Sequence, residues 1–151
     1  MDQVDIGYLL NKATRNFRLR LGDSLTETGL RPQQAAALMA ISRSPGEHLT
    51  PGALAHAIET DAATTSGLIE RLTRDGWIDS VSNPEDGRSR LVGLTIKAQK
   101  ILPAVLVAAN AVSSEATSRL TLDEVETLRN LLYRLWPEED INAFTRKAGP
   151  R

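Results

Sequence analysis

The amino-acid sequence predicts a mainly α-helical fold with one small β-hairpin. Apolar residues recur at helical spacing through most of the 151 residues. Only residues 77–81 and 91–94 read as strands of a hairpin, and the turn-rich residues 83–88 separate them. Two short predicted helices come directly before this hairpin. The order helix, turn, helix, hairpin predicts a winged helix-turn-helix.

The two helices before the hairpin have defined boundaries. Thr50 can cap the first helix, and Pro51 suits its first turn. Asp61 is a good N-cap for the second helix, which we expect to run to about Asp75. Gly76 can then end this helix in the left-handed conformation. The second helix therefore has the place of a recognition helix.

Further helices surround this unit. Residues 4–28 have an amphipathic pattern that ends near Gly29, and Pro32 begins a helix that residues 44–46 break. A short strand at residues 48–49 could pair with the hairpin.

Two more helices are predicted after the hairpin. Thr95 can cap a long helix, and Thr121 with Glu124 forms a capping box for the last one. The apolar stripe of this last helix is too wide for one neighbour, and residues 4–28 also carry an apolar stripe. We therefore predict one domain over residues 1–151, with a DNA-binding lobe at 30–95 and a helical dimerisation lobe at 4–28 and 96–146.

Composition excludes several classes of protein. A charged fraction of 25% and a hydrophobic fraction of 41% are ordinary for a globular domain, and the net charge of -1 gives no overall sign of nucleic-acid binding. The absence of cysteine excludes disulfides and thiol redox sensing. No secretory signal or membrane-length apolar run is present, so we expect a cytoplasmic protein without membrane segments.

No pattern for catalysis or metal binding is present either. His48 and His56 are the only histidines, and neither has metal-ligand spacing. A GxSxG elbow, a P-loop and a dinucleotide-binding glycine pattern are all missing. We therefore expect no catalytic residue, no metal and no cofactor.

The second helix and the hairpin offer residues suited to DNA. Opposite the apolar stripe, the helix residues predicted to contact DNA are Thr64, Thr65, Ser66, Arg71 and Arg74. The alternative for the two arginines is pairing with Glu70 or Asp75 on the helix surface. In the hairpin, Arg88 and Arg90 alternate with Ser89, so a strand-like backbone would point both guanidinium groups to one side.

Several motifs in register resemble the MarR family of bacterial transcriptional regulators over nearly the whole chain. They are Leu54-Ala55, Asp61 with Thr64, Leu68-Ile69-Glu70-Arg71-Leu72, Gly76-Trp77-Ile78, Asp86-Gly87-Arg88-Ser89-Arg90 and Leu94-Thr95. The resemblance implies that Arg88 enters the minor groove, and that Asp86 and Arg90 hold the wing in shape or touch phosphate. The sequence departs from the family pattern at Glu59, where the turn often has Gly, and at Gly67, where a larger polar or basic residue is common.

The resemblance also implies regulation. It implies a homodimeric repressor on double-stranded DNA that a small aromatic or anionic effector releases. From their ring, amide and cationic groups we predict that Tyr8, Asn11, Lys12 and Arg15 contribute to the effector pocket. A solvated basic face, or contacts with phosphate, is the alternative for these four residues. The alternative for the whole chain is a winged-helix module that binds protein instead of DNA.

Overall fold

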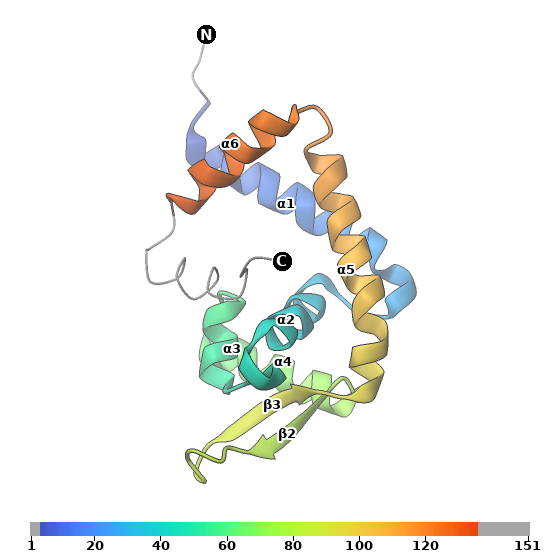
Figure 1. Ribbon diagram of the computed structural model, residues 1–151, viewed down its shortest axis with the longest axis vertical. Helices are drawn as coiled ribbons and strands as arrows, with labels where there is room; N and C mark the ends of the chain where they lie inside the picture. Colours follow the sequence, from blue (N-terminus) through green and yellow to red (C-terminus); the bar gives the residue numbers. More distant parts are fainter. Residues whose placement is uncertain (1–3, 136–151) are drawn as a thin grey trace. The chain divides into compact units, whose positions relative to one another are not determined.

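The computed structural model describes residues 4–135 and contains both the helix-turn-helix and the hairpin (Figure 1). In chain order the elements are α1 (Ile6–Ser24), η1 (Thr26–Thr28), α2 (Pro32–Arg43), η2 (Pro45–Glu47), β1 (His48–Leu49), α3 (Pro51–Ala57), α4 (Ala62–Arg74), β2 (Ile78–Ser82), β3 (Arg90–Leu94), α5 (Ile96–Ala116) and α6 (Leu122–Tyr133). The predicted mainly helical, winged helix-turn-helix fold is confirmed. The chain divides into two compact units, Met1–Val112 and Ser113–Arg151.

A three-stranded antiparallel sheet lies in the first unit, with the strand order β1-β3-β2. In the hairpin, Ile78 pairs with Leu94 and Ser82 pairs with Arg90. The predicted short strand is also present, because Leu49 of β1 pairs with Val92 of β3. Figure 1 shows the far end of the hairpin extending away from α2 and α3, which leaves the hairpin tip open.

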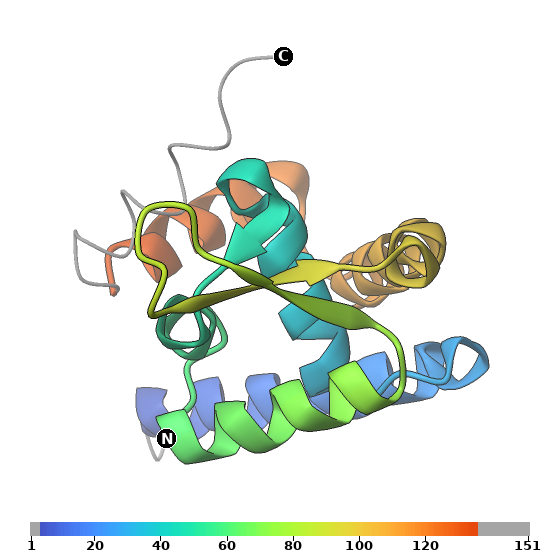
Figure 2. The same ribbon diagram turned by 90° about the horizontal axis from the view of Figure 1, so that it is seen from below.

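The core of the first unit joins the helices to the sheet. Its fully buried large side chains include Leu38, Ile41, Leu54, Leu68, Leu72, Ile78, Val92 and Val105. They come from α2, α3, α4, α5 and the two hairpin strands, and burial of each such side chain contributes about 1.5–3 kcal/mol. Figure 2 shows α4 on one side of the hairpin strands, with its last turn next to the start of β2. The core therefore holds the recognition helix and the wing against each other.

The predicted helix boundaries of the helix-turn-helix are confirmed by local hydrogen bonds. The Thr50 hydroxyl accepts from the amide of Ala53 at 3.1 Å. The Asp61 carboxylate accepts from the amide of Thr64 at 2.7 Å. Gly76 has a φ of 77°, the left-handed conformation that ends α4 after Arg74.

The first helix ends earlier than predicted. The α-helix stops at Ser24, and the predicted last turn is a separate 3₁₀ segment, Thr26–Thr28, before Gly29 at a φ of 73°. The Thr26 hydroxyl donates to the carbonyl of Asp23 at 2.8 Å. Such side-chain bonds compete with helical backbone bonds, so threonine favours a change of helix type here.

The second unit contains the predicted capping box. The amide of Thr121 donates to Glu124 Oε2 at 2.8 Å, and the amide of Glu124 donates to the Thr121 hydroxyl at 3.3 Å. None of the residues of α6 is buried, and Leu131 is 49% exposed. Residues 136–146 of the predicted dimerisation lobe lie outside the described residues. Among residues 4–135, no helix has the length and apolar character needed to cross a membrane.

Candidate nucleic-acid interface

The recognition helix α4 has one buried stripe and one open face. The stripe consists of Thr65, Leu68 and Leu72, which recur every three or four residues. On the open face, the exposed polar residues are Thr64, Ser66, Glu70, Arg71, Thr73 and Arg74. An exposed helix face with short side chains in its first turns can approach base edges in a major groove.

The prediction that Thr65 belongs to the open face is wrong. Its side chain is 1% exposed, and its hydroxyl shares a 2.6 Å hydrogen bond with the hydroxyl of Thr60. Thr65 precedes Leu68 by three residues and Leu72 by seven, so it continues the buried stripe. This spacing was the available sequence signal, and it places Thr65 on the buried side of α4.

Thr64 and Asp61 form the N-terminal end of this face. The Thr64 hydroxyl donates to Asp61 Oδ2 at 2.9 Å, and the Thr64 amide donates to Asp61 Oδ1. These two hydrogen bonds favour the carboxylate and hold the pKa of Asp61 below its usual value. The Thr64 oxygen keeps its capacity to accept a hydrogen bond from a base amino group.

The two arginines of α4 differ in their surroundings. Arg74 Nε lies 3.1 Å from Asp75 Oδ1, so the predicted alternative of surface pairing is the one observed for Arg74. The Arg71 side chain has no hydrogen bond or ion pair with any residue of the described part. Its Nη1 lies 3.6 Å from the position that a Cβ on Gly67 would occupy. A Cβ at this position would therefore be in ordinary contact with the guanidinium group, which lies beside the helix.

The hairpin tip is held by bonds within its own turn. Asp86 Oδ1 accepts from the amide of Arg88 at 3.0 Å, and the Asp86 carbonyl accepts from the amide of Ser89. Asn83 Nδ2 donates to the Ser89 hydroxyl at 2.9 Å. The Arg88 side chain is exposed and makes no hydrogen bond or ion pair within residues 4–135. It is thus free to reach a partner outside the chain.

Arg90 has a different environment. Its Nε donates to the Ser80 hydroxyl at 3.0 Å, and its Nη2 donates to the Ser80 carbonyl at 2.7 Å. The expectation of a strand-like backbone from Arg88 to Arg90 is wrong, because β3 begins at Arg90 and Arg88 lies in the turn. Ser80, which was not among the predicted site residues, anchors Arg90 from the paired strand.

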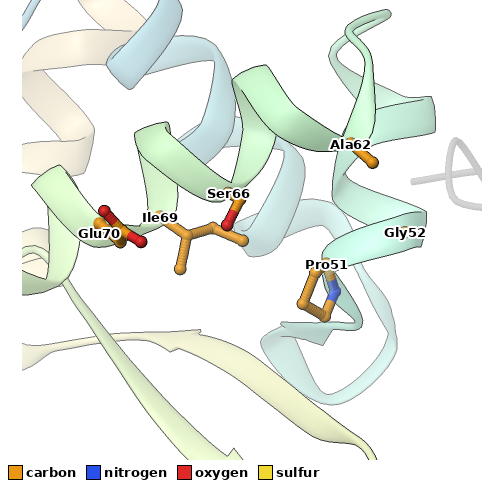
Figure 3. Close-up of a pocket in the computed structure, with 6 residues that line it drawn as sticks. All are labelled: Pro51, Gly52, Ala62, Ser66, Ile69 and Glu70. Carbon is orange, nitrogen blue, oxygen red and sulfur yellow. The ribbon is translucent and has the colours of Figure 1, made fainter.

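A hollow of about 200 Å³ lies between the beginning of α3 and the face of α4. Its lining consists of Pro51, Gly52, Ala62, Ser66, Ile69 and Glu70. In Figure 3, the side chains of Ser66 and Ile69 project from α4 on the side of Pro51. Most of these residues were not predicted as site residues, because only the tertiary packing of two helices brings them together.

A lysine supports the C-terminal end of α4 from the next helix. Lys97 Nζ donates to the carbonyl of Asp75 at 2.7 Å and lies 4.0 Å from the ring centroid of Trp77. A cation next to the carbonyl end of a helix, and above an aromatic face, is favourable on both counts. Lys97 therefore ties the first turn of α5 to the end of the recognition helix.

The four side chains predicted for the effector pocket are all exposed on α1. Tyr8 and Lys12 are in contact, because Lys12 Nζ lies 5.8 Å from the Tyr8 ring centroid. Asn11 and Arg15 follow at helical spacing, which brings the set to one side of the helix. Their role in effector binding stays a prediction. Within residues 4–135, no group of three or more metal-ligating side chains occurs.

Several known proteins resemble this chain in sequence and in structure. A model of the MarR family matches residues 28–89. The transcriptional regulator HosA of Escherichia coli O111:H- is 30% identical over 102 residues, which cover 68% of this chain and 74% of HosA. A crystal structure of a probable transcriptional regulator from Pseudomonas aeruginosa is 34% identical, with a TM-score of 0.78 and coverage of 88% of this chain and 98% of that one.

A structure with DNA is also similar. It contains a mutant of MarR from Escherichia coli complexed with operator DNA, and it is 27% identical with a TM-score of 0.80. The similarity covers 89% of this chain and 95% of the MarR chain. The relatives are transcriptional regulators, and the match of the family model includes the recognition helix and the tip of the wing. This chain belongs to the MarR family of transcriptional regulators.

Proposed function

We propose that this regulator is a homodimeric repressor that binds a pseudo-palindromic operator and is released by a small aromatic or anionic effector. The observation that carries the proposal is the exposed face of α4 next to a wing whose Arg88 has no partner in the described part of the chain. In this proposal α4 enters the major groove, and Arg88 enters the flanking minor groove, where a narrow groove attracts arginine.

The other interface residues have supporting roles in this proposal. Thr64, Ser66 and Arg71 contact bases or phosphates from α4. Asp86 and Arg90 keep the wing in shape, through the Arg88 amide and through Ser80 respectively. Arg74 is divided between Asp75 and phosphate, so its loss should matter less than the loss of Arg71.

Two subunits are needed to read a pseudo-palindrome. Exposed leucines on α6 and exposed apolar residues on α1, such as Ile6 and Leu9, support association with a second copy. Two-fold symmetry would place two α4 helices about 34 Å apart, one turn of DNA.

Release by an effector needs a ligand that prefers the dimer geometry with the wrong helix spacing. Tyr8, Asn11, Lys12 and Arg15 support an aromatic or anionic ligand, because they combine a ring, an amide and two cations. The combined variant Lys12→Gln and Arg15→Gln should keep operator binding and lose release by aromatic carboxylates. Unchanged release would contradict an effector pocket at these residues. Weaker operator binding would instead favour contact between these residues and phosphate.

The experiment that tests the proposal is anisotropy binding to duplexes selected from a random pool, at several salt concentrations. Arg88→Ala should weaken binding and lower the slope of log affinity against log salt by about one. Arg119→Ala is the matched control, because Arg119 is also an exposed arginine but lies in the second unit.

The outcomes separate the two candidate functions. Enrichment of a pseudo-palindromic duplex supports an operator-binding regulator, if Arg88→Ala weakens its binding and Arg119→Ala does not. If no duplex is enriched and no salt-dependent binding occurs, the fold serves protein binding instead, and the proposal is overturned.

A further inference from the structure

The hollow between α3 and α4 has a chemistry that differs from the rest of the interface. Pro51, Ala62 and Ile69 give it an apolar lining, and Ser66 and Glu70 are its polar members (Figure 3). Ile69 is only half-buried by the core, so part of its side chain faces the hollow. An apolar depression on a recognition helix is suited to a methyl group and not to a phosphate.

We propose that this hollow receives the 5-methyl group of a thymine in the major groove and thereby sets a thymine preference in each half-site. The proposal rests on the proposed function, because it needs α4 in the major groove. Thymine is the standard base that presents a methyl group there, and contact with apolar side chains is how that group is recognised. Ile69 and Ala62 contribute this apolar contact from α4.

The charge beside the hollow also favours a base over an anion as its occupant. The Glu70 side chain is exposed, and its carboxylate has no hydrogen bond or ion pair with any other described residue. Its carboxylate repels phosphate and other anions from the hollow and can accept a hydrogen bond from an amino group of cytosine or adenine. The hollow therefore fits a base edge that offers a methyl group with an amino group beside it. A free anionic ligand does not fit.

Replacement of thymine by deoxyuridine tests the proposal, because it removes only the methyl group. Each thymine of the selected duplex is replaced in turn, and the affinity of the full chain is measured by anisotropy. For the wild type, one position in each half-site should lose about fourfold in affinity, the value expected for one buried methyl group. Other thymines should tolerate the change.

A double-mutant cycle assigns the effect to the hollow. In Ile69→Ala the difference between thymine and deoxyuridine at that position should fall to near onefold, and Ile69→Val, the milder change, should reduce it in part. Ile101→Val is the matched control, because Ile101 is a half-buried isoleucine of α5 outside the hollow. This control should keep the full difference.

The results distinguish the methyl site from the operator binding on which it depends. A sensitive thymine whose effect disappears with Ile69→Ala, or diminishes with Ile69→Val, supports the methyl site. The methyl site is overturned if a pseudo-palindrome is enriched but tolerates deoxyuridine at every thymine. It is also overturned if the loss at the sensitive position is the same in both Ile69 variants as in the wild type. Either result leaves the proposed operator binding intact. Failure to enrich any duplex overturns both.

Discussion

Glu59 occupies the turn between α3 and α4 with a φ of 54°, in the left-handed region that glycine favours. A residue with a side chain in that region destabilises the folded state by roughly 1–2 kcal/mol relative to glycine. Glycine offsets part of this difference, because it also raises the conformational entropy of the unfolded chain. Glu59→Gly should therefore raise the free energy of unfolding by about 0.5–1 kcal/mol, measured by urea denaturation.

The matched control for this change is another exposed glutamate. Glu85→Gly removes the same side chain from the hairpin loop, at a residue that does not have a positive φ. It should leave stability unchanged or lower it slightly. Equal effects of the two substitutions would show that charge, and not backbone conformation, is responsible.

Single residues of similar chemistry also have different roles in the wing. Arg90 is bound to Ser80, whereas the Arg88 side chain has no partner among residues 4–135. A cation that already has partners has less to gain from phosphate than one without. For this reason the Arg88→Ala test above should reduce DNA binding directly, while Arg90→Ala should act through the shape of the wing.

At the scale of the helix, Gly67 weakens the middle of α4. Glycine in a helix interior is about 1 kcal/mol less favourable than alanine, and an added Cβ would meet Arg71 Nη1 at 3.6 Å, an ordinary contact. Gly67→Ala should therefore stabilise the protein by about 1 kcal/mol in thermal or urea unfolding. Gly76→Ala, at a φ of 77°, should have the opposite sign.

The end of α4 depends on Lys97 in the next helix. Lys97→Met keeps an unbranched side chain of similar length but removes the charge above Trp77 and the bond to the Asp75 carbonyl. We expect a loss of about 1 kcal/mol in the free energy of unfolding, since both interactions are near the surface. Lys100→Met, one turn further along α5, should have little effect. Equal losses in the free energy of unfolding of both variants would contradict a specific role of Lys97.

For the whole molecule, association is the property that the exposed apolar side chains support. Leu131 of α6 is 49% exposed, and no residue of α6 is buried in the single chain. Light scattering at micromolar concentration should give twice the chain mass of 16.5 kDa. Leu131→Glu should shift the protein toward monomer and weaken operator binding by at least tenfold. A monomer can contact only one of the two half-sites, so the contribution of the second half-site is lost.

Asn130→Glu is the control for this substitution, because it adds the same single negative charge to α6 at an exposed position. A wild-type monomer at micromolar concentration would contradict the dimer. Dissociation by both variants alike would indicate an electrostatic effect instead of loss of apolar contact.

Much of the fold follows from the sequence alone, because its signals are local. The helix caps at Thr50, Asp61 and Thr121 depend on hydrogen bonds that span three residues, so their sequence context is sufficient. The same holds for Gly76, whose conformation is set by its own lack of a side chain. The motifs in register, which include the wing, are likewise a property of the sequence, and they indicate the MarR family without any knowledge of packing.

Only tertiary structure decided how the interface is arranged. Thr65 is buried against Thr60, Arg90 is bound to Ser80 across two strands, and Lys97 reaches a carbonyl 22 residues away. The hollow between α3 and α4 likewise depends on how two helices pack. The physical reason is that exposure and side-chain partners depend on neighbours distant in sequence, whereas caps and turns depend on adjacent residues.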